Sequence, residues 1–454
     1  MSTNIQKNQI TEGIIWRQLL LFFFPILLGT FFQQLYNTID SVIVGQFVGK
    51  EALAAVGGSS AQIVAFVVGF FTGLSSGASV TIAQFFGAKD SRSANKGLHT
   101  AYAIAAFGGL ILTVSGIILT PFLLEMMNTP ADIVADSAVY LRIYFAGIIF
   151  VLIYNMGSAI LRATGDSKRP LYYLIVCCII NIVLDVLFVI VFHMGVMGVA
   201  VATLIAQAVS AVLVTLKLMR SEGILKLSVK QIRFHGSILK MQLKLGLPTG
   251  FEAILFSITN IAIQSAVNTF GTDTTAAWSA YGKLDAIFWM VSTAFGIAIT
   301  TFVGQNYGAG KMDRVRKSTR VCLLMDFIVS AVLVVFLIAA RFLLFRLFTN
   351  DSHVIEIGCD MLVLITPWYI VYVFIEVIAG ALRGVGNVVV PVAITLLGVC
   401  VLRIAWLAAM LKISPTISAI ILSYPVTWVI TALAFIIYYI YITHKTIAGS
   451  SKKH

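Results

Sequence analysis

The sequence predicts an all-α polytopic membrane protein with twelve transmembrane helices in two six-helix lobes. Of its 454 residues, 59% are hydrophobic and only 11% are charged, whereas a soluble chain carries about 25% charged residues. The mean hydropathy is +0.98. Apolar runs of about 20 to 28 residues recur along the whole chain, and each is long enough to cross a hydrocarbon core of about 30 Å.

The apolar runs define twelve candidate spans. The fifth and sixth runs meet at His193-Met194-Gly195, and we divide them there because the combined run is too long for a single crossing. In chain order we expect the spans near residues 14–39, 52–82, 97–120, 138–161, 171–193, 195–219, 242–267, 277–303, 319–345, 358–382, 388–411 and 417–443.

The basic residues predict the orientation. Most of the 31 Lys and Arg residues fall at the two termini and in the loops that follow even-numbered spans. The positive-inside rule then places both termini in the cytoplasm of a multi-pass protein of the cell (inner or plasma) membrane. The net charge of +12 is spread over short loops beside the bilayer rather than over a folded basic surface. This pattern argues against nucleic acid as a partner.

The two halves of the chain repeat each other. QFFGAK at 84–89 returns as QNYGAGK at 305–311, and LRATG at 161–165 returns as LRGVG at 382–386. The matching positions lie 221 residues apart, which indicates a duplicated six-helix unit. Because six crossings is an even number, both copies enter from the same side and the repeat is parallel. We therefore expect an N-terminal lobe at 1–220, a cytoplasmic linker at 221–240 and a C-terminal lobe at 241–454.

Asp40 is the first candidate functional residue. It lies in an apolar run, where a charged side chain costs about 2.5 to 3.5 kcal/mol on insertion scales. Asn181 and Asp185, four residues apart in the fifth span, share one face of a helix. Either a residue that reaches the headgroups or a hydrogen-bonded pair that fixes helix packing is a structural alternative to a proton or cation site.

Several motifs, in the right order and spacing, resemble the multidrug and toxic compound extrusion (MATE) family along essentially the whole chain. The resemblance implies a V-shaped pair of six-helix lobes around a central cleft, and antiport of organic compounds against protons or sodium ions. The matching stretches are YNTIDSVIVGQFVGKEALAAVG (36–57), AQFFGAKD (83–90), AILRATGDSKRP (159–170), NIVLDVLFV (181–189), GVMGVAVAT (195–203), VGQNYGAGKMDRV (303–315) and GALRGVGN (380–387).

The resemblance also implies that Asp40, Asn181, Asp185 and Thr203 meet in the N-terminal lobe as the ion-coupling site. Two carboxyl groups in one buried site can share a proton near neutral pH. The same oxygens suit Na⁺, so H⁺ and Na⁺ both remain open as the coupling ion. Pro25 removes a helix hydrogen bond from the first span, and we expect it to act as a hinge there. A static kink is the alternative.

Polar and aromatic residues of both halves are candidates to line the substrate cleft. Aromatic and Met surfaces suit flat lipophilic cations, although most such residues in a membrane protein serve packing. Glu252 and Glu376 do not fall where some family members carry a C-terminal sodium site, so we carry no such site over. The candidates are Gln33, Gln34, Tyr36, Asn37, Gln62, Tyr154, Asn155, Gln264, Trp278, Tyr281, Met290, Glu252, Asp285 and Glu376.

Two other function classes compete with an antiporter. A flippase for a lipid-linked precursor is the first alternative, but it requires a strongly cationic cavity, and buried acids here outnumber buried bases. A membrane enzyme is unsupported because the chain has no HExxH motif or nucleophile elbow. The sequence also lacks the phosphate loop of an ATP-driven pump. We therefore expect small-molecule substrates and the lipid bilayer as partners, no cofactor beyond the coupling ion and no obligate protein partner.

Overall fold

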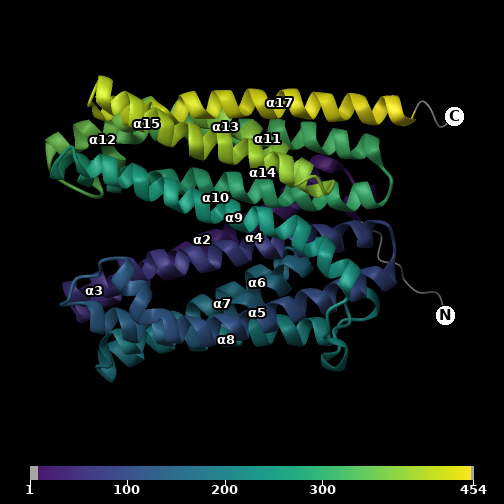
Figure 1. Cartoon of the computed structure of the whole chain (residues 1–454), viewed down its shortest axis with the longest axis horizontal. Coiled ribbons are helices and arrows are strands. Elements are labelled where there is room, and N and C mark those ends of the chain that lie inside the picture. The colour runs from purple at the N-terminus through teal and green to yellow at the C-terminus, as the bar shows by residue number, and fades with distance from the viewer. Residues whose placement is uncertain (1–8, 451–454) are drawn as a thin grey trace. The chain divides into compact units, whose positions relative to one another are not determined.

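The computed structural model of the chain describes residues 9–450, and every regular element within that range is helical (Figure 1). Twelve of its helical segments are long and apolar enough to cross a membrane. The predicted all-α class and number of spans are confirmed. The first half contains α1 (Gln9–Glu12), α2 (Ile15–Phe47), α3 (Lys50–Gly57), α4 (Ser59–Gly87), α5 (Ser91–Met126), α6 (Val134–Ala163), α7 (Lys168–Asp185), η1 (Val186–Val191) and α8 (Gly195–Met219).

Two short 3₁₀ turns and then the second half follow. Several spans are built from consecutive elements: α3 with α4, α7 with η1, α12 through η4 to α13, α14 through η5 to α15, and α16 with α17. The elements are η2 (Gly223–Leu225), η3 (Val229–Gln231), α9 (Gly236–Asn268), α10 (Thr272–Gly308), α11 (Met312–Arg346), α12 (Ser352–Ile365), η4 (Thr366–Trp368), α13 (Tyr369–Gly384), α14 (Val389–Thr395), η5 (Leu396–Val401), α15 (Leu402–Ile413), α16 (Ile417–Ile421) and α17 (Ser423–Ser450).

The break between the fifth and sixth spans lies where the sequence predicts it. His193 and Gly195 both have positive φ, 53° and 58°. Such left-handed residues interrupt a right-handed helix, so η1 ends at Val191 and α8 begins at Gly195.

The backbone repeats the duplication seen in the sequence. Gly165 and Gly386 occupy matching positions after α6 and α13, with φ of 98° and 87°. Their backbone amides donate to the backbone carbonyls of Arg162 and Arg383, respectively, at 2.9 Å in both cases. A φ in this range suits glycine because it has no Cβ. The two LRxxG turns therefore keep one conformation in both halves.

The chain divides into two compact units, and the boundaries lie inside helices. The N-terminal unit is Leu21–Ala253, and the C-terminal unit comprises the residues up to Leu20 and those from Ile254 onward. These boundaries cut α2 and α9, whereas the predicted lobe limits of 220 and 241 follow the loops.

Facing glycines explain why the first half of α9 belongs to the N-terminal unit. A Cβ on Gly73 would lie 2.4 Å from the backbone nitrogen of Gly250, and one on Gly77 would lie 2.4 Å from that of Gly246. Within each helix the two glycines are four residues apart, Gly73 and Gly77 on α4 and Gly246 and Gly250 on α9. This GxxxG spacing lets membrane helices approach closely. α4 and the first half of α9 therefore pack backbone against backbone.

The segment before α2 is held by the C-terminal unit. Arg314 on α11 donates to the carbonyl of Ile10 at 3.0 and 3.2 Å and also to that of Gly13. Lys311 donates to the carbonyl of Thr11 at 3.0 Å. These bonds account for the assignment of the residues up to Leu20 to the C-terminal unit.

The predicted linker is held by the N-terminal unit in a comparable way. Asn95 on α5 donates to the carbonyls of Ile224 and Lys226 at 3.1 Å. The amide of Ser228 donates to His99 Nε2 at 3.0 Å. Each unit therefore holds the stretch of chain that leads into a helix divided between the units.

Candidate functional site

The N-terminal unit brings two acidic side chains together in its interior. Asp40 lies on α2 and is 9% exposed, and Asp185 is the last residue of α7 and is fully buried. Their carboxyl groups interact electrostatically. Because ionised carboxylates only accept hydrogen bonds, a hydrogen bond between the two requires a proton on one of them. This arrangement can hold one proton between them.

The other two predicted coupling residues form a second contact beside this pair. Asn181 Nδ2 donates to Thr203 Oγ1 on α8 at 3.5 Å. The i, i+4 spacing of Asn181 and Asp185 connects the two contacts on one face of α7. Asp40 Oδ1, Asn181 Oδ1 and both Asp185 oxygens are buried and have no hydrogen-bond partner among the described residues. Such oxygens are also the ligands that hard cations prefer.

The helix that carries Asp185 changes geometry directly after it. The π-helical turn η1 begins at Val186. Short π segments inside α-helices occur often at functional sites.

Aromatic side chains lie near the acidic pair: Tyr36, which the sequence predicts as a cleft residue, and Tyr140 and Tyr144, which sequence reasoning missed. Tyr140 on α6 interacts electrostatically with both Asp40 and Asp185, and its ring stacks on that of Tyr144 at 6.2 Å between centroids. Tyr36 is buried near Asp40, and its hydroxyl accepts a hydrogen bond from Gln207 Nε2 at 3.4 Å. The four-residue spacing of Tyr140 and Tyr144 was a usable signal, because it puts both rings on one helix face.

The remaining N-terminal candidates have mixed environments. Pro25 is buried within α2, which continues through it as one helix. Tyr154 donates its hydroxyl to the carbonyl of Pro170 at 3.0 Å, which is a packing contact. Asn155 is half-buried. The exposed candidates are Gln33, Gln34, Asn37 and Gln62.

The C-terminal unit gathers five predicted cleft residues around a cavity of its own, with a volume of about 470 Å³. The five are Gln264, Trp278, Tyr281, Asp285 and Glu376. Met290 on α10 is half-buried and does not line it. Glu252 is half-buried on the part of α9 that belongs to the N-terminal unit and also does not line it.

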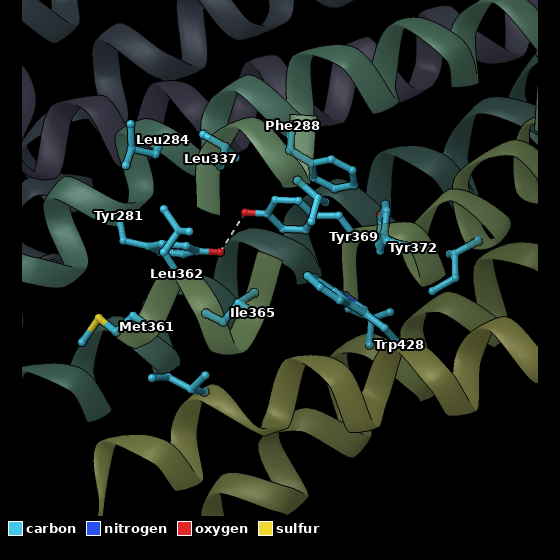
Figure 2. Packing of buried hydrophobic residues seen from close by; sticks show 14 of the residues in the cluster. Tyr281, Leu284, Phe288, Leu337, Met361, Leu362, Ile365, Tyr369, Tyr372 and Trp428 are labelled. Atoms are coloured by element: carbon cyan, nitrogen blue, oxygen red, sulfur yellow. Dashed lines mark hydrogen bonds between the residues drawn. The ribbon is translucent and has the colours of Figure 1, made fainter. Parts of the chain in front are cut away.

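Asp285 is held in this cavity by three donors. It accepts hydrogen bonds from the Tyr369 hydroxyl at 2.5 Å, the Trp289 indole at 2.7 Å and the Tyr281 hydroxyl at 3.3 Å. Tyr281 and Tyr369 also bond to each other at 2.9 Å, and Figure 2 shows their hydroxyls turned toward one another. The Tyr369 ring stacks on Phe288 at 3.9 Å between centroids. The carboxylate is therefore fixed in position.

Arg403, at the start of α15, places a positive charge in the same cavity. It is 3% exposed and follows the π-helical turn η5. Its guanidinium lies over the Tyr424 ring at 4.0 Å and donates to Thr427 at 3.0 Å. Arg403 and Asp285 interact electrostatically. The other acid, Glu376, accepts a hydrogen bond from Arg383 at 3.0 Å.

A sequence model of the MatE family matches residues 25–187 and 248–407 of the chain. The chain belongs to the MATE family. A probable multidrug resistance protein of Bacillus subtilis, YoeA, is 30% identical over 393 residues, which cover 85% of this chain and 84% of the relative. A probable multidrug resistance protein of Thermotoga maritima, NorM, is 27% identical over 420 residues, which cover 90% of this chain and 88% of the relative.

The fold of the chain matches solved MATE structures over its whole length. A crystal structure described as MATE in the bent conformation superposes with a TM-score of 0.90 at 20% identity, covering 99% of both chains. Membership of the MATE family identifies the protein as a multi-pass membrane transporter rather than an enzyme, in line with the sequence prediction.

Proposed function

We propose that this MATE transporter is a secondary antiporter that exports organic, cationic or lipophilic compounds in exchange for protons or sodium ions. The proposed coupling site is formed by Asp40 and Asp185 with Asn181 and Thr203. The observation that carries the proposal is the burial of two carboxyl groups that interact electrostatically with each other. Two carboxyl groups this close cannot both stay ionised away from water without a bound proton or cation. Binding of a proton or a cation therefore relieves their repulsion.

The energy available to one proton suffices for export. One charge that crosses a potential of 100 mV releases about 2.3 kcal/mol, and one pH unit adds about 1.4 kcal/mol. Together they sustain an outward gradient of a neutral compound of a few hundred-fold. The multidrug names of the relatives support the class of cargo.

Pro25 is proposed to let α2 bend when the charge of the Asp40–Asp185 pair changes. Its position about four turns before Asp40 on one continuous helix supports this role. A related MATE structure is described as bent. Pro25→Ala should restore the missing backbone donor and slow transport without abolishing substrate binding. Transport at the wild-type rate would show that the bend is not the coupling step.

The proposed setting is the cell membrane with both termini in the cytoplasm; the terminal residues themselves lie outside the described range. Small organic compounds are the proposed cargo, and no obligate protein partner is proposed.

Sealed proteoliposomes test the coupling directly. A fluorescent organic cation is loaded, and its efflux is followed after an imposed pH step or, separately, an imposed sodium step. Wild-type protein should respond to one of the two steps, and Asp40→Asn should respond to neither. Asp360→Asn, on the exposed face of α12, is the matched control and should behave as wild type.

Two results would overturn the proposal. Efflux by Asp40→Asn that follows the ion step as in wild type would remove the carboxyl pair from coupling. Efflux of no organic compound, together with rescue of envelope synthesis in a flippase-deficient strain, would favour the lipid-linked precursor flippase instead.

A further inference from the structure

The cavity of the C-terminal unit has the size and walls of a ligand site. Its volume of about 470 Å³ lies within the range of about 300–1,000 Å³ typical of small-molecule pockets. Two of its lining residues, Asn260 and Gly282, are exposed, so the cavity reaches the surface of the unit. Seven aromatic side chains line it: Phe256, Trp278, Tyr281, Trp289, Tyr372, Tyr424 and Trp428.

The negative groups of this cavity already have donors. Asp285 accepts three hydrogen bonds, from Tyr281, Trp289 and Tyr369. Glu376 accepts one from Arg383 at 3.0 Å. Neither acid therefore depends on a ligand cation to satisfy its oxygens.

The positive group of the cavity, the Arg403 guanidinium, has few hydrogen-bond partners. A guanidinium has five N–H donors, and Arg403 makes one hydrogen bond, to Thr427, among the described residues. None of the ion pairs within residues 9–450 includes Arg403. A buried charge without a hydrogen-bonded counter-charge is costly. An acceptor delivered by a ligand would offset that cost.

We propose that the C-terminal cavity binds a planar aromatic compound that carries an anionic oxygen group such as a carboxylate. The carboxylate accepts hydrogen bonds from Arg403, for which guanidinium geometry is well suited. The ring of the compound packs among the Trp and Tyr side chains. This site is separate from the acidic pair around Asp40, so it stands whether or not the proposed coupling is correct.

Matched probes of opposite charge test this site. Binding of 1-naphthoate and of 1-naphthylmethylammonium to the full-length protein in nanodiscs is measured by calorimetry, with empty nanodiscs subtracted. Naphthoate should bind at least about tenfold more tightly than the ammonium compound, a difference of about 1.4 kcal/mol. Arg403→Gln should remove that preference, and Arg403→Lys should keep part of it.

A second variant keeps the test valid if Arg403→Gln fails to fold. A Cβ added at Gly282 would meet no other atom within 4 Å, so Gly282→Leu should fold. Because Gly282 lines the cavity, the leucine should take up ligand space, and naphthoate binding should fall at least about tenfold. Asp40→Asn should bind naphthoate as wild type does, which separates this site from coupling. Equal affinity for the two probes, or naphthoate binding unchanged by Gly282→Leu, would overturn the proposal.

Discussion

The N-terminal unit pairs two acids, Asp40 and Asp185, whereas the C-terminal unit places Arg403 near an acid, Asp285, inside aromatic walls. The two sites use corresponding spans of the duplicated fold. Asp185 lies in the fifth span and Arg403 in the eleventh, and the 221-residue offset places Arg403 level with Ile182, although the π turns of the two spans occupy different positions. Like charges bind a proton or a cation because that relieves repulsion. In the C-terminal unit Asp285 already accepts three other hydrogen bonds, which leaves donors of Arg403 for a ligand. We therefore propose ion coupling in one half of the duplicated unit and ligand binding in the other.

Neutralising the acids should have the largest effect, and only in the N-terminal unit. Asp185→Asn should lower the steady-state substrate gradient that an imposed ion step sustains by about 100-fold, because the coupled ion no longer drives export. Asp285→Asn should still respond to the imposed ion step and change only the apparent affinity for substrate. Steady-state substrate gradients in proteoliposomes check the first expectation, and initial efflux rates over a substrate series check the second. An ion response lost in Asp285→Asn and kept in Asp185→Asn would reverse the assignment of the two units.

The stability of the two units should respond in opposite ways to loss of one charge. Arg403→Gln removes the buried positive charge near Asp285 and should lower the free energy of unfolding by about 3 kcal/mol. Asp40→Asn removes repulsion and should leave it unchanged or raise it. Unfolding in mild detergent, followed by tryptophan fluorescence, measures both. Partial recovery in the double variant Arg403→Gln/Asp285→Asn is expected; no recovery would mean that the two charges do not interact.

The terminal segment held by the C-terminal unit should open when its donor is removed. Arg314→Ala loses the bonds to the carbonyls of Ile10 and Gly13. This loss should cost about 2 kcal/mol locally, or about 30-fold in amide exchange over residues 10–20. Arg316→Ala, which breaks only a 3.9 Å pair with fully exposed Asp313, is the matched control. Equal exchange in the two variants would contradict the anchoring role of Arg314.

The linker held by the N-terminal unit should respond weakly to pH. Burial, Arg233, Lys96 and His99 lower the pKa of His235, whose ring and amide bond to Thr100 at 3.1 and 3.3 Å. Because the pKa is lowered, the docked linker binds fewer protons than the released one, whose His titrates near pH 6.5. Docking should therefore be complete above about pH 6.5 and weaken as the pH falls below it. Amide exchange of residues 228–235 is measured across this pH range in the wild type and in His235→Asn. The same pH dependence in both proteins would contradict a role of His235 in docking.

The number of spans, the repeat and the approach of Asp40 to Asp185 follow from local signals. Apolar run length predicts the spans, a constant 221-residue offset predicts the repeat, and family motifs predict the acidic pair. Helical spacing shows which residues share a face, but not which helix that face meets. For this reason the sequence could not show that Asp285 and Arg403 share one cavity.

The boundaries between the two compact units have no signal in the amino-acid composition. The compact units divide α2 and α9 in their interiors, where no loop or change in composition occurs. The cause is non-local: GxxxG pairs between α4 and α9, and Arg314 on the N-terminal segment. Such contacts join residues more than 150 positions apart, so only the three-dimensional fold shows them.

Proton release measured on purified protein tests the central claim most directly. Saturating cationic substrate or Na⁺ is added to detergent-solubilised transporter in weakly buffered solution, and the pH change is converted to protons per molecule. The wild type and Arg403→Gln should each release about one proton, the one shared by Asp40 and Asp185. Asp40→Asn and Asp185→Asn should release none. Release that persists in both Asn variants would contradict the claim that this pair holds the coupling ion.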